Sequence, residues 1–504
     1  MKRLSRCFLS GIGLVILLSS GGEANGAGRP NVLFLVVDDM RDWVGCLGGY
    51  PGEVKTPNID RLAGKGVLFT NAHCPSPKCA PSRAATMTGL MPSTTGLYDN
   101  GHWWYPNLPD VVTIPAHFRA HGYRTVGAGK IFHHTAGNHP PNQWNHFQPI
   151  RFNDDPWFRG SDLNYPWTAG APFPAGYPFS GVEGLPHEND WGAIPRAESD
   201  YDDRQTADYA VRFLENFSGE QPFFLACGLF RPHLPWYVPQ RFLDLYPLAT
   251  VRLPHIKEGD LSDVPSEGRA LARARRSDFE RIQAAGKWRE AVRAYLASIS
   301  YADDLLGRVL DALERSGTAE NTVVVLWSDH GLHLGEKEHW HKSTLWEAAT
   351  RVPLIIAAPN YARGRCQIPV SLVDIYPTLI ELCGLSSIEQ LDGESLVSML
   401  KAPGKHQDRA AVTEFRRGNA TLRTGSHRYT HYSNDGQELY NHLEDPHEWH
   451  NLIEEPEGQG LARLLSRHLP DSWAPSAPTK AAYSFDPESF TWTEKKSGRV
   501  ISGR

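Results

Sequence analysis

The sequence carries little excess charge of either sign, and it contains no internal repeat and no low-complexity tract. Its 504 residues include 51 lysines and arginines against 57 aspartates and glutamates, so the formal net charge is −6. Nucleic-acid-binding proteins usually present a strongly basic face, and this composition argues against that class of partner. Any attraction for an anionic substrate must therefore be local to a pocket.

Cysteine is also scarce, with seven residues in the whole chain. Such a small number over this length does not form the disulfide framework that holds small secreted domains together. An exported chain can still form individual disulfides. Two pairings, Cys74 with Cys79 and Cys366 with Cys383, both stay open at this point.

The chain has a short apolar run near its start, over residues 7–18, that is too short to span a bilayer as a stable anchor. Basic residues precede this run and the small-residue segment ANGA follows it, which is the pattern of a cleaved export signal. Cleavage after Ala24 or Ala27 is expected. The sequence therefore predicts a signal peptide over residues 1–27 and an exported protein, periplasmic or secreted, with an uncleaved anchor as the alternative.

Short apolar runs alternate with helical patterns through most of the chain. Apolar residues recur at helical spacing over Trp288–Glu314, and a second helix is expected over Asp374–Leu382. Strands that alternate with helices predict an α/β fold, with a large, mainly parallel or mixed sheet flanked by helices. The predicted core strands are Asn31–Val37, Pro222–Ala226, Thr322–Trp327 and Pro353–Ala357.

Two stretches depart from this alternation. Residues 134–200 are rich in proline, glycine, tryptophan and asparagine without a clear period, which predicts long ordered loops over one end of the sheet. After about residue 400 the apolar runs become short and alternating, with turn signals between them. We therefore expect a main domain over residues 28–400 and a smaller C-terminal α+β subdomain with an antiparallel sheet over residues 401–504.

Carboxylates follow two of the predicted strands directly. Asp38 and Asp39 end the first strand, and Asp329-His330 follow another. Ligands of open α/β sheets bind outside the carboxyl ends of the strands, and adjacent carboxylates repel each other unless a cation lies between them. Three carboxylates and an imidazole favour Ca²⁺ or Mg²⁺ over Zn²⁺. A divalent-cation site is expected here, while a solvated turn is the alternative for Asp38-Asp39.

A longer motif begins at Cys79. By itself, a cysteine of an exported chain would be a buried thiol or half of a disulfide. However, the stretch CAPSRAATMTG, from Cys79 to Gly89, resembles the type I sulfatase signature C-x-P-S-R followed by x-x-x-[LM]-T-G. Further segments resemble the iduronate-2-sulfatase branch of that family, which lies in the alkaline phosphatase superfamily. They are PNVLFLVVDDMR, Gly129-Lys130-x-x-His133, Arg231-Pro232-His233, and SDHGLHLGE with Lys342. The stretch ELYNHLEDPHEWHNL resembles a sulfatase C-terminal region.

The resemblance implies a secreted sulfatase, a sulfuric ester hydrolase whose Cys79 is oxidised to formylglycine by a sulfatase-maturing enzyme. One hydroxyl of the hydrated aldehyde would attack sulfur, and the other would later expel sulfate. Asp329 would accept the proton of the attacking hydroxyl. Many sulfatases have asparagine in place of His330, and the iduronate-type branch shares the histidine. The resemblance implies one Ca²⁺ ion held by Asp38, Asp39, the modified Cys79, Asp329 and His330.

The same resemblance assigns roles around the nucleophile. Arg83 would hold the hydrated aldehyde, and Lys130 and Lys342 would contact sulfate oxygens. His133 would assist breakdown of the sulfated intermediate, and His233 would protonate the leaving oxygen.

The resemblance also makes a sulfated carbohydrate the expected substrate, with a uronate 2-O-sulfate as the first guess. Aromatic side chains near the motifs offer flat faces to sugar rings, although packing between loops is their more ordinary role. These residues are His102-Trp103-Trp104-Tyr105, Trp144, Trp157, Trp167 and Trp191. Two other functions stay open: a phosphate or phosphonate ester hydrolase of the same superfamily, and a catalytically dead protein that binds sulfated glycans.

Overall fold

The computed structural model describes residues 28–150, 178–186, 189–405 and 407–504. The expected signal peptide and two of the candidate aromatic residues, Trp157 and Trp167, lie outside these ranges. Among the residues that the structure describes, no helix combines the length and the apolar character needed to cross a membrane.

Eight strands form the main sheet, in the order β13-β2-β12-β9-β1-β7-β4-β5. Neighbouring strands are parallel, except that β12 runs antiparallel to both β9 and β2. The prediction of a large, mainly parallel or mixed sheet is confirmed. The strands are β1 (Asn31–Val37), β2 (Val67–Phe69), β4 (Arg124–Gly129), β5 (His146–Gln148), β7 (Phe223–Leu229), β9 (Thr322–Ser328), β12 (Leu354–Ala357) and β13 (Gly364–Cys366).

The antiparallel direction of β12 has a simple cause. The segment between β9 and β12 contains only one short α-helix, α11 (Glu347–Thr350), and no long helix that returns along the sheet. A parallel crossover needs such a return. The chain instead stays at the carboxyl edge of β9, where it supplies residues 329–342, and re-enters the sheet from that edge.

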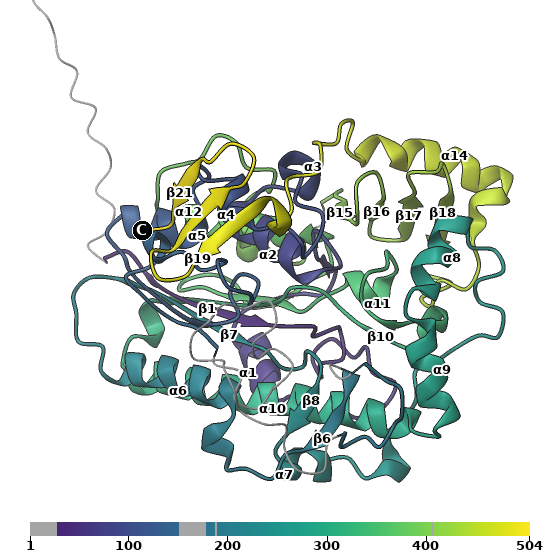
Figure 1. The fold of residues 1–504 in the computed structure, drawn as a ribbon, viewed down its shortest axis with the longest axis horizontal. Coiled ribbons are helices and arrows are strands. Elements are labelled where there is room, and N and C mark those ends of the chain that lie inside the picture. The colour runs from purple at the N-terminus through teal and green to yellow at the C-terminus, as the bar shows by residue number, and fades with distance from the viewer. Residues whose placement is uncertain (1–27, 151–177, 187–188, 406) are drawn as a thin grey trace, which may run out of the picture.

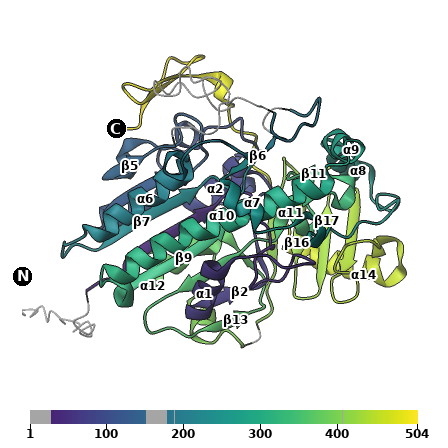
Figure 2. The same ribbon diagram turned by 90° about the horizontal axis from the view of Figure 1, so that it is seen from below.

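The side chains of β1 alternate between two hydrophobic cores, and all of its residues are buried. Leu33, Leu35 and Val37 pack with α1, α6 and α10, while Val32 and Phe34 pack on the opposite face with α2, α5 and α12. Figures 1 and 2 show the sheet between these two helical layers. The helices are α1 (Pro57–Lys65), α2 (Cys79–Thr88), α5 (Ile114–Ala120), α6 (Asp202–Glu215), α10 (Trp288–Arg315) and α12 (Ile375–Leu382).

Shorter elements connect this framework. Part of the stretch expected to be loop forms strands, because β5 adds the last strand to the main sheet and β6 pairs with β8. The short strands are β3 (Ala72–His73), β6 (Trp191–Ala193), β8 (Trp236–Val238), β10 (His333–Leu334), β11 (Trp340–His341) and β14 (Val370–Ser371). The short helices are α3 (Pro92–Thr95), α4 (Trp104–Asn107), α7 (Gln240–Asp244), α8 (Ser266–Arg273), α9 (Arg276–Ala284) and α13 (Val397–Lys401).

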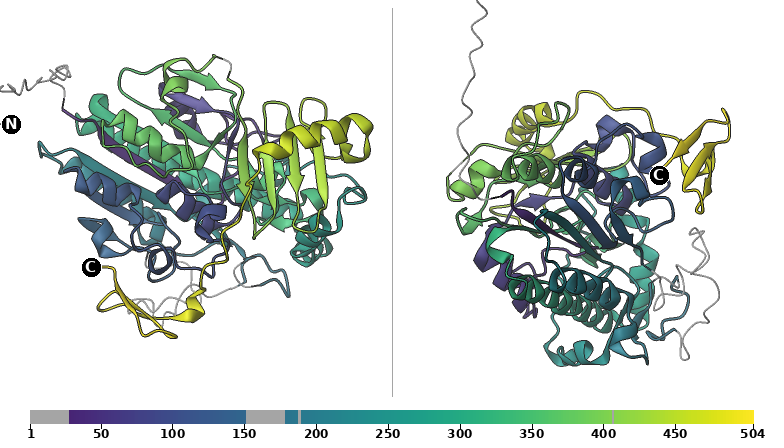
Figure 3. Two further views of the ribbon diagram at one scale, coloured as in Figure 1. Left: turned by 90° about the horizontal axis from the view of Figure 1, so that it is seen from above. Right: turned by 90° about the vertical axis from the view of Figure 1, so that its left-hand side faces the viewer.

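The C-terminal region contains two separate antiparallel sheets, which Figure 3 shows joined by a long connection. The second sheet packs against the main domain, where the Trp492 ring lies 5.1 Å from that of Tyr105. The division into residues 28–400 and 401–504 stays our proposal. The elements are β15 (Ala411–Glu414), β16 (Ala420–Arg423), β17 (His427–His431), β18 (Gln437–Asn441) and α14 (Pro456–Leu465), followed by β19 (Tyr483–Asp486), β20 (Thr491–Glu494) and β21 (Val500–Ser502).

Candidate active site and metal centre

The candidate site lies at the carboxyl edge of four neighbouring strands, β9, β1, β7 and β4. Each of these strands is followed within a few residues by one or more of the expected site residues, and Cys79 is the first residue of α2. These residues, which come from distant parts of the sequence, therefore meet at one edge of the sheet, as expected for an open α/β fold.

Four of the five expected metal ligands form one tight group. Asp38, Asp39, Cys79 and His330 each offer a ligand atom, and these atoms all lie within 4.8 Å of one another. His330 Nε2 is 3.2 Å from Cys79 Sγ, and His330 Nδ1 is 3.4 Å from Asp39 Oδ1. The fifth, Asp329, adjoins the group with its Oδ2 3.6 Å from His330 Nε2. Carboxylate oxygens dominate this donor set, which fits a hard divalent cation such as Ca²⁺.

Arg83 braces these ligands from within α2. Its Nη2 donates to Asp38 Oδ1 at 3.0 Å, and its Nε donates to Asp329 Oδ2 at 2.8 Å. Its Nη1 donates to the carbonyl oxygens of Lys130 and Ile131. The guanidinium is fully buried and thus joins the ends of β1, β9 and β4, a position from which it orients carboxylates.

Two lysines complete the charge of the site. Lys342 Nζ donates to Asp39 Oδ1 at 2.7 Å and Oδ2 at 2.9 Å, and it lies 3.3 Å from Cys79 Sγ. Lys130 Nζ is paired with the Asp38 carboxylate. Both ammonium groups therefore contact metal-ligand carboxylates beside the expected nucleophile.

The two expected histidines have different neighbours. His233 Nε2 is 3.9 Å from Asp39 Oδ2, which places it beside the ligand group. His133 Nδ1 lies 3.1 Å from Thr135 Oγ1, and its ring centroid is 4.3 Å from that of His134. Burial lowers the pKa of both imidazoles well below the ordinary value. Neighbouring His134 and lysines lower that of His133 further, and Lys342 and Lys130 lower that of His233.

Burial and the three basic residues set the acidities of the centre. Burial opposes the charged form of Asp38, yet Lys130 and Arg83 outweigh it and hold the pKa of that carboxyl well below its usual range. Burial raises the pKa of Asp39 to about 7 despite Lys342. Burial also raises the pKa of the Cys79 thiol. Since the thiolate is the reactive form of cysteine, an unmodified Cys79 is a poor nucleophile here.

Comparisons with known proteins identify the family of the chain. The family model described as Sulfatase matches residues 30–385, and that described as N-sulphoglucosamine sulphohydrolase, C-terminal, matches residues 335–473. A sulfatase of Formosa agariphila is 37% identical over 490 residues, covering 94% of this chain and 92% of its own length. Iduronate 2-sulfatase of Mus musculus is 33% identical over 438 residues, covering 76% and 74%.

A solved structure shares the fold as well. The phosphonate monoester hydrolase of Agrobacterium radiobacter superposes with a TM-score of 0.72 at 23% identity, covering 94% of this chain and 100% of that one. The chain belongs to the sulfatase family, as a type I sulfatase, and is a sulfuric ester hydrolase.

All six cysteines in the described part of the chain are free thiols. Neither pairing left open by the sequence, Cys74 with Cys79 or Cys366 with Cys383, is formed. Cys79 instead contacts His330 and Lys342, so its side chain is available for the site.

The described aromatic candidates pack within the fold. Trp103, Trp104, Trp144 and Trp191 are all buried. The ring of Trp104 stacks on Phe132 with centroids 4.5 Å apart. Packing between loops, the more ordinary role, therefore accounts for them, because they leave almost no ring face open to a sugar.

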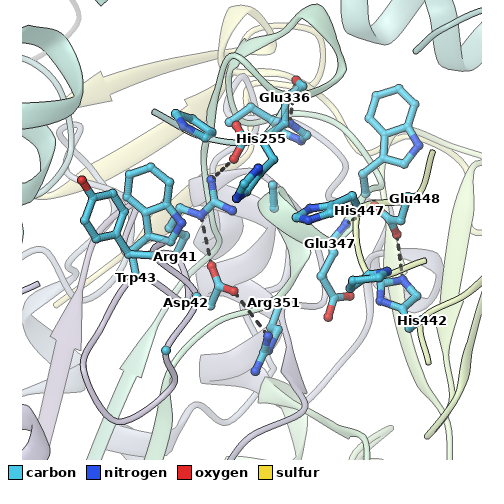
Figure 4. A pocket seen from close by; sticks show the side chains of 18 of the residues that line it. Arg41, Asp42, Trp43, His255, Glu336, Glu347, Arg351, His442, His447 and Glu448 are labelled. Carbon is cyan, nitrogen blue, oxygen red and sulfur yellow. Dashed lines mark hydrogen bonds and ion pairs between the residues drawn. The ribbon is translucent and has the colours of Figure 1, made fainter. Parts of the chain in front are cut away.

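Sequence reasoning missed a second cluster of ligand-type side chains. Ligand atoms of Glu347, His442 and Glu448 lie within 4.8 Å of one another, at the wall of a cavity of about 520 Å³ between the main domain and the β15–β18 sheet (Figure 4). Arg428 pairs with both glutamates, with its Nε 2.6 Å from Glu448 Oε1. No local signal predicts this cluster, because Glu347 lies far in the sequence from the segment that contains His442 and Glu448.

Proposed function

We propose that this sulfatase removes sulfate from a sulfated carbohydrate, using a formylglycine made from Cys79 and one bound Ca²⁺ ion. The observation that carries the proposal is the position of Cys79 Sγ, which is 3.2 Å from His330 Nε2 and 3.3 Å from Lys342 Nζ within the ligand group. The identity with iduronate 2-sulfatase supports a uronate 2-O-sulfate as the substrate class. A sulfatase-maturing enzyme is the required partner, and export is part of the proposal.

The metal would be held by Asp38, Asp39, His330 and the side chain at position 79, with Asp329 beside them. When present, Ca²⁺ would draw charge from a sulfate oxygen, and the hydrated formylglycine would supply a nucleophilic hydroxyl. Asp329 Oδ1 accepts hydrogen bonds from the amides of Asp39 and His330, both at 3.1 Å. Because Arg83 Nε donates to Oδ2, the Asp329 carboxylate has one fixed orientation beside His330, and in this proposal it receives the proton of that hydroxyl.

The charge of the site suits a sulfate ester. Three acidic and three basic side chains contact one another, so the protein contributes no large net charge, and a divalent ion leaves the centre positive. That excess attracts the sulfate group locally, although the whole chain is slightly acidic. The six residues are Asp38, Asp39, Asp329, Arg83, Lys130 and Lys342.

The lysines bind the sulfate oxygens in this proposal. Each ammonium group has three donors on a flexible stem, so Lys342 and Lys130 can contact sulfate while they stay close to Asp39 and Asp38. His233, beside Asp39, delivers a proton to the leaving oxygen. The negative sulfate favours the protonated imidazole, against the burial that lowers its pKa. His133 assists release of sulfate.

Mass spectrometry of the peptide that contains Cys79 tests the nucleophile. Oxidation of the thiol to the aldehyde replaces sulfur by oxygen, so the converted peptide is lighter. We expect conversion in protein produced with a sulfatase-maturing enzyme, together with turnover of an aryl sulfate far above that of the matching aryl phosphate. Cys79→Ala should fold and lose turnover. Near-normal sulfate release by Cys79→Ala would contradict the mechanism.

A panel of sulfated disaccharides tests the substrate class. We expect release from a uronate 2-O-sulfate and little release from glucosamine 6-O-sulfate. If the enzyme hydrolysed aryl sulfate but none of the sulfated sugars, the proposed chemistry would stand and the proposed substrate class would be wrong.

A further inference from the structure

The loop over residues 335–344, which carries Lys342, has a strained backbone. Four of its non-glycine residues have a positive φ: Lys337 (55°), Glu338 (52°), His341 (85°) and Ser343 (75°). Side chains with a Cβ adopt this region only at a cost in free energy. Such conformations persist only where the surrounding structure holds them. The position of Lys342 therefore depends on contacts that hold this loop.

Lys337, a residue of this loop, is held by hydrogen bonds, an ion pair and two aromatic rings. Lys337 Nζ donates to Asp260 Oδ1 at 2.8 Å and to the carbonyl oxygen of Glu448. It also lies 5.3 Å from the ring centroid of Tyr440 and 5.6 Å from that of Trp346. The side chains of Lys337 and Asp260 are each only 3% exposed. A lysine is rarely buried to this extent unless it is paired.

These contacts join the loop to two other regions of the chain. Asp260 lies in the segment before α8, and Glu448 follows β18 in the C-terminal region. Within the loop, His339 Nε2 lies 2.8 Å from the carbonyl oxygen of Lys342 itself. Lys337 and His339 thus both shortly precede Lys342 in the sequence, while the Lys342 ammonium contacts Asp39 and Cys79.

We propose that Lys337 is a positioning residue, which anchors the strained loop to Asp260 and to the C-terminal region and so fixes the ammonium of Lys342 beside Cys79. The inference rests on the proposed role of Lys342 in binding the substrate sulfate. It gives the C-terminal region a part in catalysis without any contact to the substrate.

A paired substitution tests this anchor. Lys337→Met alone leaves Asp260 buried without its cation, so Lys337→Met with Asp260→Asn removes both charges together. We expect this double variant to fold, to lose about 100-fold in kcat/KM for an aryl sulfate, and to be inhibited about tenfold more weakly by inorganic sulfate. A folded double variant with unchanged sulfate inhibition would overturn the inference.

A second buried ion pair provides a matched control. Arg409 Nη2 lies 2.7 Å from Asp374 Oδ1, with side chains 12% and 1% exposed, and neither residue belongs to the loop. Arg409→Met with Asp374→Asn should lower stability by a similar amount and leave sulfate inhibition unchanged. Equal loss of sulfate inhibition in both double variants would make the effect of Lys337 merely structural and overturn the inference.

The Lys342→Ala background separates this inference from the proposed function. Once the Lys342 ammonium is absent, its position no longer affects turnover. We therefore expect the paired Lys337 substitution to change kcat/KM by less than about twofold in this background. A full 100-fold effect in that background would overturn the inference alone. If Lys342→Ala itself kept normal turnover, the assignment of Lys342 would fail, and the inference with it.

Discussion

In the part of the chain that the structure describes, two clusters contain side chains of types that can bind a metal ion, and they differ in the cations around them. Asp38, Asp39, Cys79 and His330 lie beside two lysines in addition to Arg83. In the second cluster, which consists of Glu347, His442 and Glu448, the two carboxylates pair with Arg423 and Arg428. A lysine ammonium is a point charge on a flexible stem, but an arginine guanidinium is a rigid planar fork. In the proposed function the lysines of the first cluster exchange a carboxylate for a sulfate oxygen, whereas the guanidinium groups of the second hold their carboxylates in one geometry.

The contacts of Arg428 show how firmly the second cluster is held. Its guanidinium is fully buried, pairs with Glu347 and Glu448, and donates to Thr350 Oγ1 at 3.0 Å. It thus joins α11 of the main domain to the C-terminal sheet. In the first cluster Arg83 takes the same bracing role, and in the proposed function this leaves Lys130 and Lys342 to bind the substrate. The comparison teaches that neighbouring cations, as much as the donor set, decide whether such a cluster is a site or a brace.

The largest expected effect is on turnover at the first cluster. Asp39→Asn removes a ligand carboxylate and the partner of Lys342, so kcat/KM for an aryl sulfate should fall by about 100- to 1,000-fold. Steady-state kinetics on folded protein measure this. The matched substitution Glu448→Gln should change kcat/KM by less than about tenfold. Equal losses of kcat/KM in the two variants would contradict the view that the first cluster is catalytic and the second structural.

The free energy of unfolding should be more sensitive to substitution at the second cluster than at the first. Glu448→Gln leaves Arg428 buried with an incomplete set of partners, and breaking a buried ion pair in this way typically costs about 3–5 kcal/mol. Urea denaturation followed by tryptophan fluorescence measures the free energy of unfolding. A loss below about 1 kcal/mol would show that the second cluster behaves like a surface ion pair and braces nothing.

Metal removal should act on the first cluster alone. Chelation with EGTA should abolish turnover, and added Ca²⁺ should restore it. The same addition should stabilise the fold by about 2.7 kcal/mol when Ca²⁺ is at 100 times its dissociation constant. Thermal melting of Glu347→Gln should show the same Ca²⁺ response as unaltered protein. A response that vanished in Glu347→Gln would place the ion at the second cluster instead.

The smallest effect concerns a buried acid held by neutral donors. Glu414 accepts hydrogen bonds from Ser93 N and Oγ, and burial raises its pKa from 4.5 to about 7. Because the folded pKa is the higher one, its contribution to stability is full below pH 4.5 and is lost as pH rises through 7. Glu414→Gln should remove most of that decline. An unchanged pH dependence of the unfolding free energy would contradict this.

Glu347 gives the contrasting case for pH. Burial opposes its charged form, but Arg423, His442 and Arg428 outweigh it and hold its pKa well below the ordinary value. Its contribution is therefore present above the ordinary pKa and is lost in acid. The two buried glutamates differ because one has cationic partners and the other has hydroxyl and amide donors.

Much of the framework was predictable from the sequence. The strand predicted over Asn31–Val37 and the helix predicted over Trp288–Glu314 appear with bounds that match or differ by one residue. Continuous apolar runs and helical periodicity are local properties of the sequence, so they can be recognised without knowing which element each one packs against. The antiparallel direction of β12 and the strands within residues 134–200 were not predictable, because each depends on where the chain re-enters a sheet.

The sequence by itself determined the types of chemical group in this protein: carboxylates placed where apolar strands end, and a cysteine in the sulfatase signature. Strand ends and signatures are local, and the parallel sheet brings the ends together. Only the tertiary structure decided how those groups are balanced. Arg83 pairs with Asp38 and Asp329, which follow two different strands, and Arg428 pairs with Glu347 and Glu448, which come from two regions of the chain. A buried charge is stable only when it is paired, and the tertiary packing determines which partner is near.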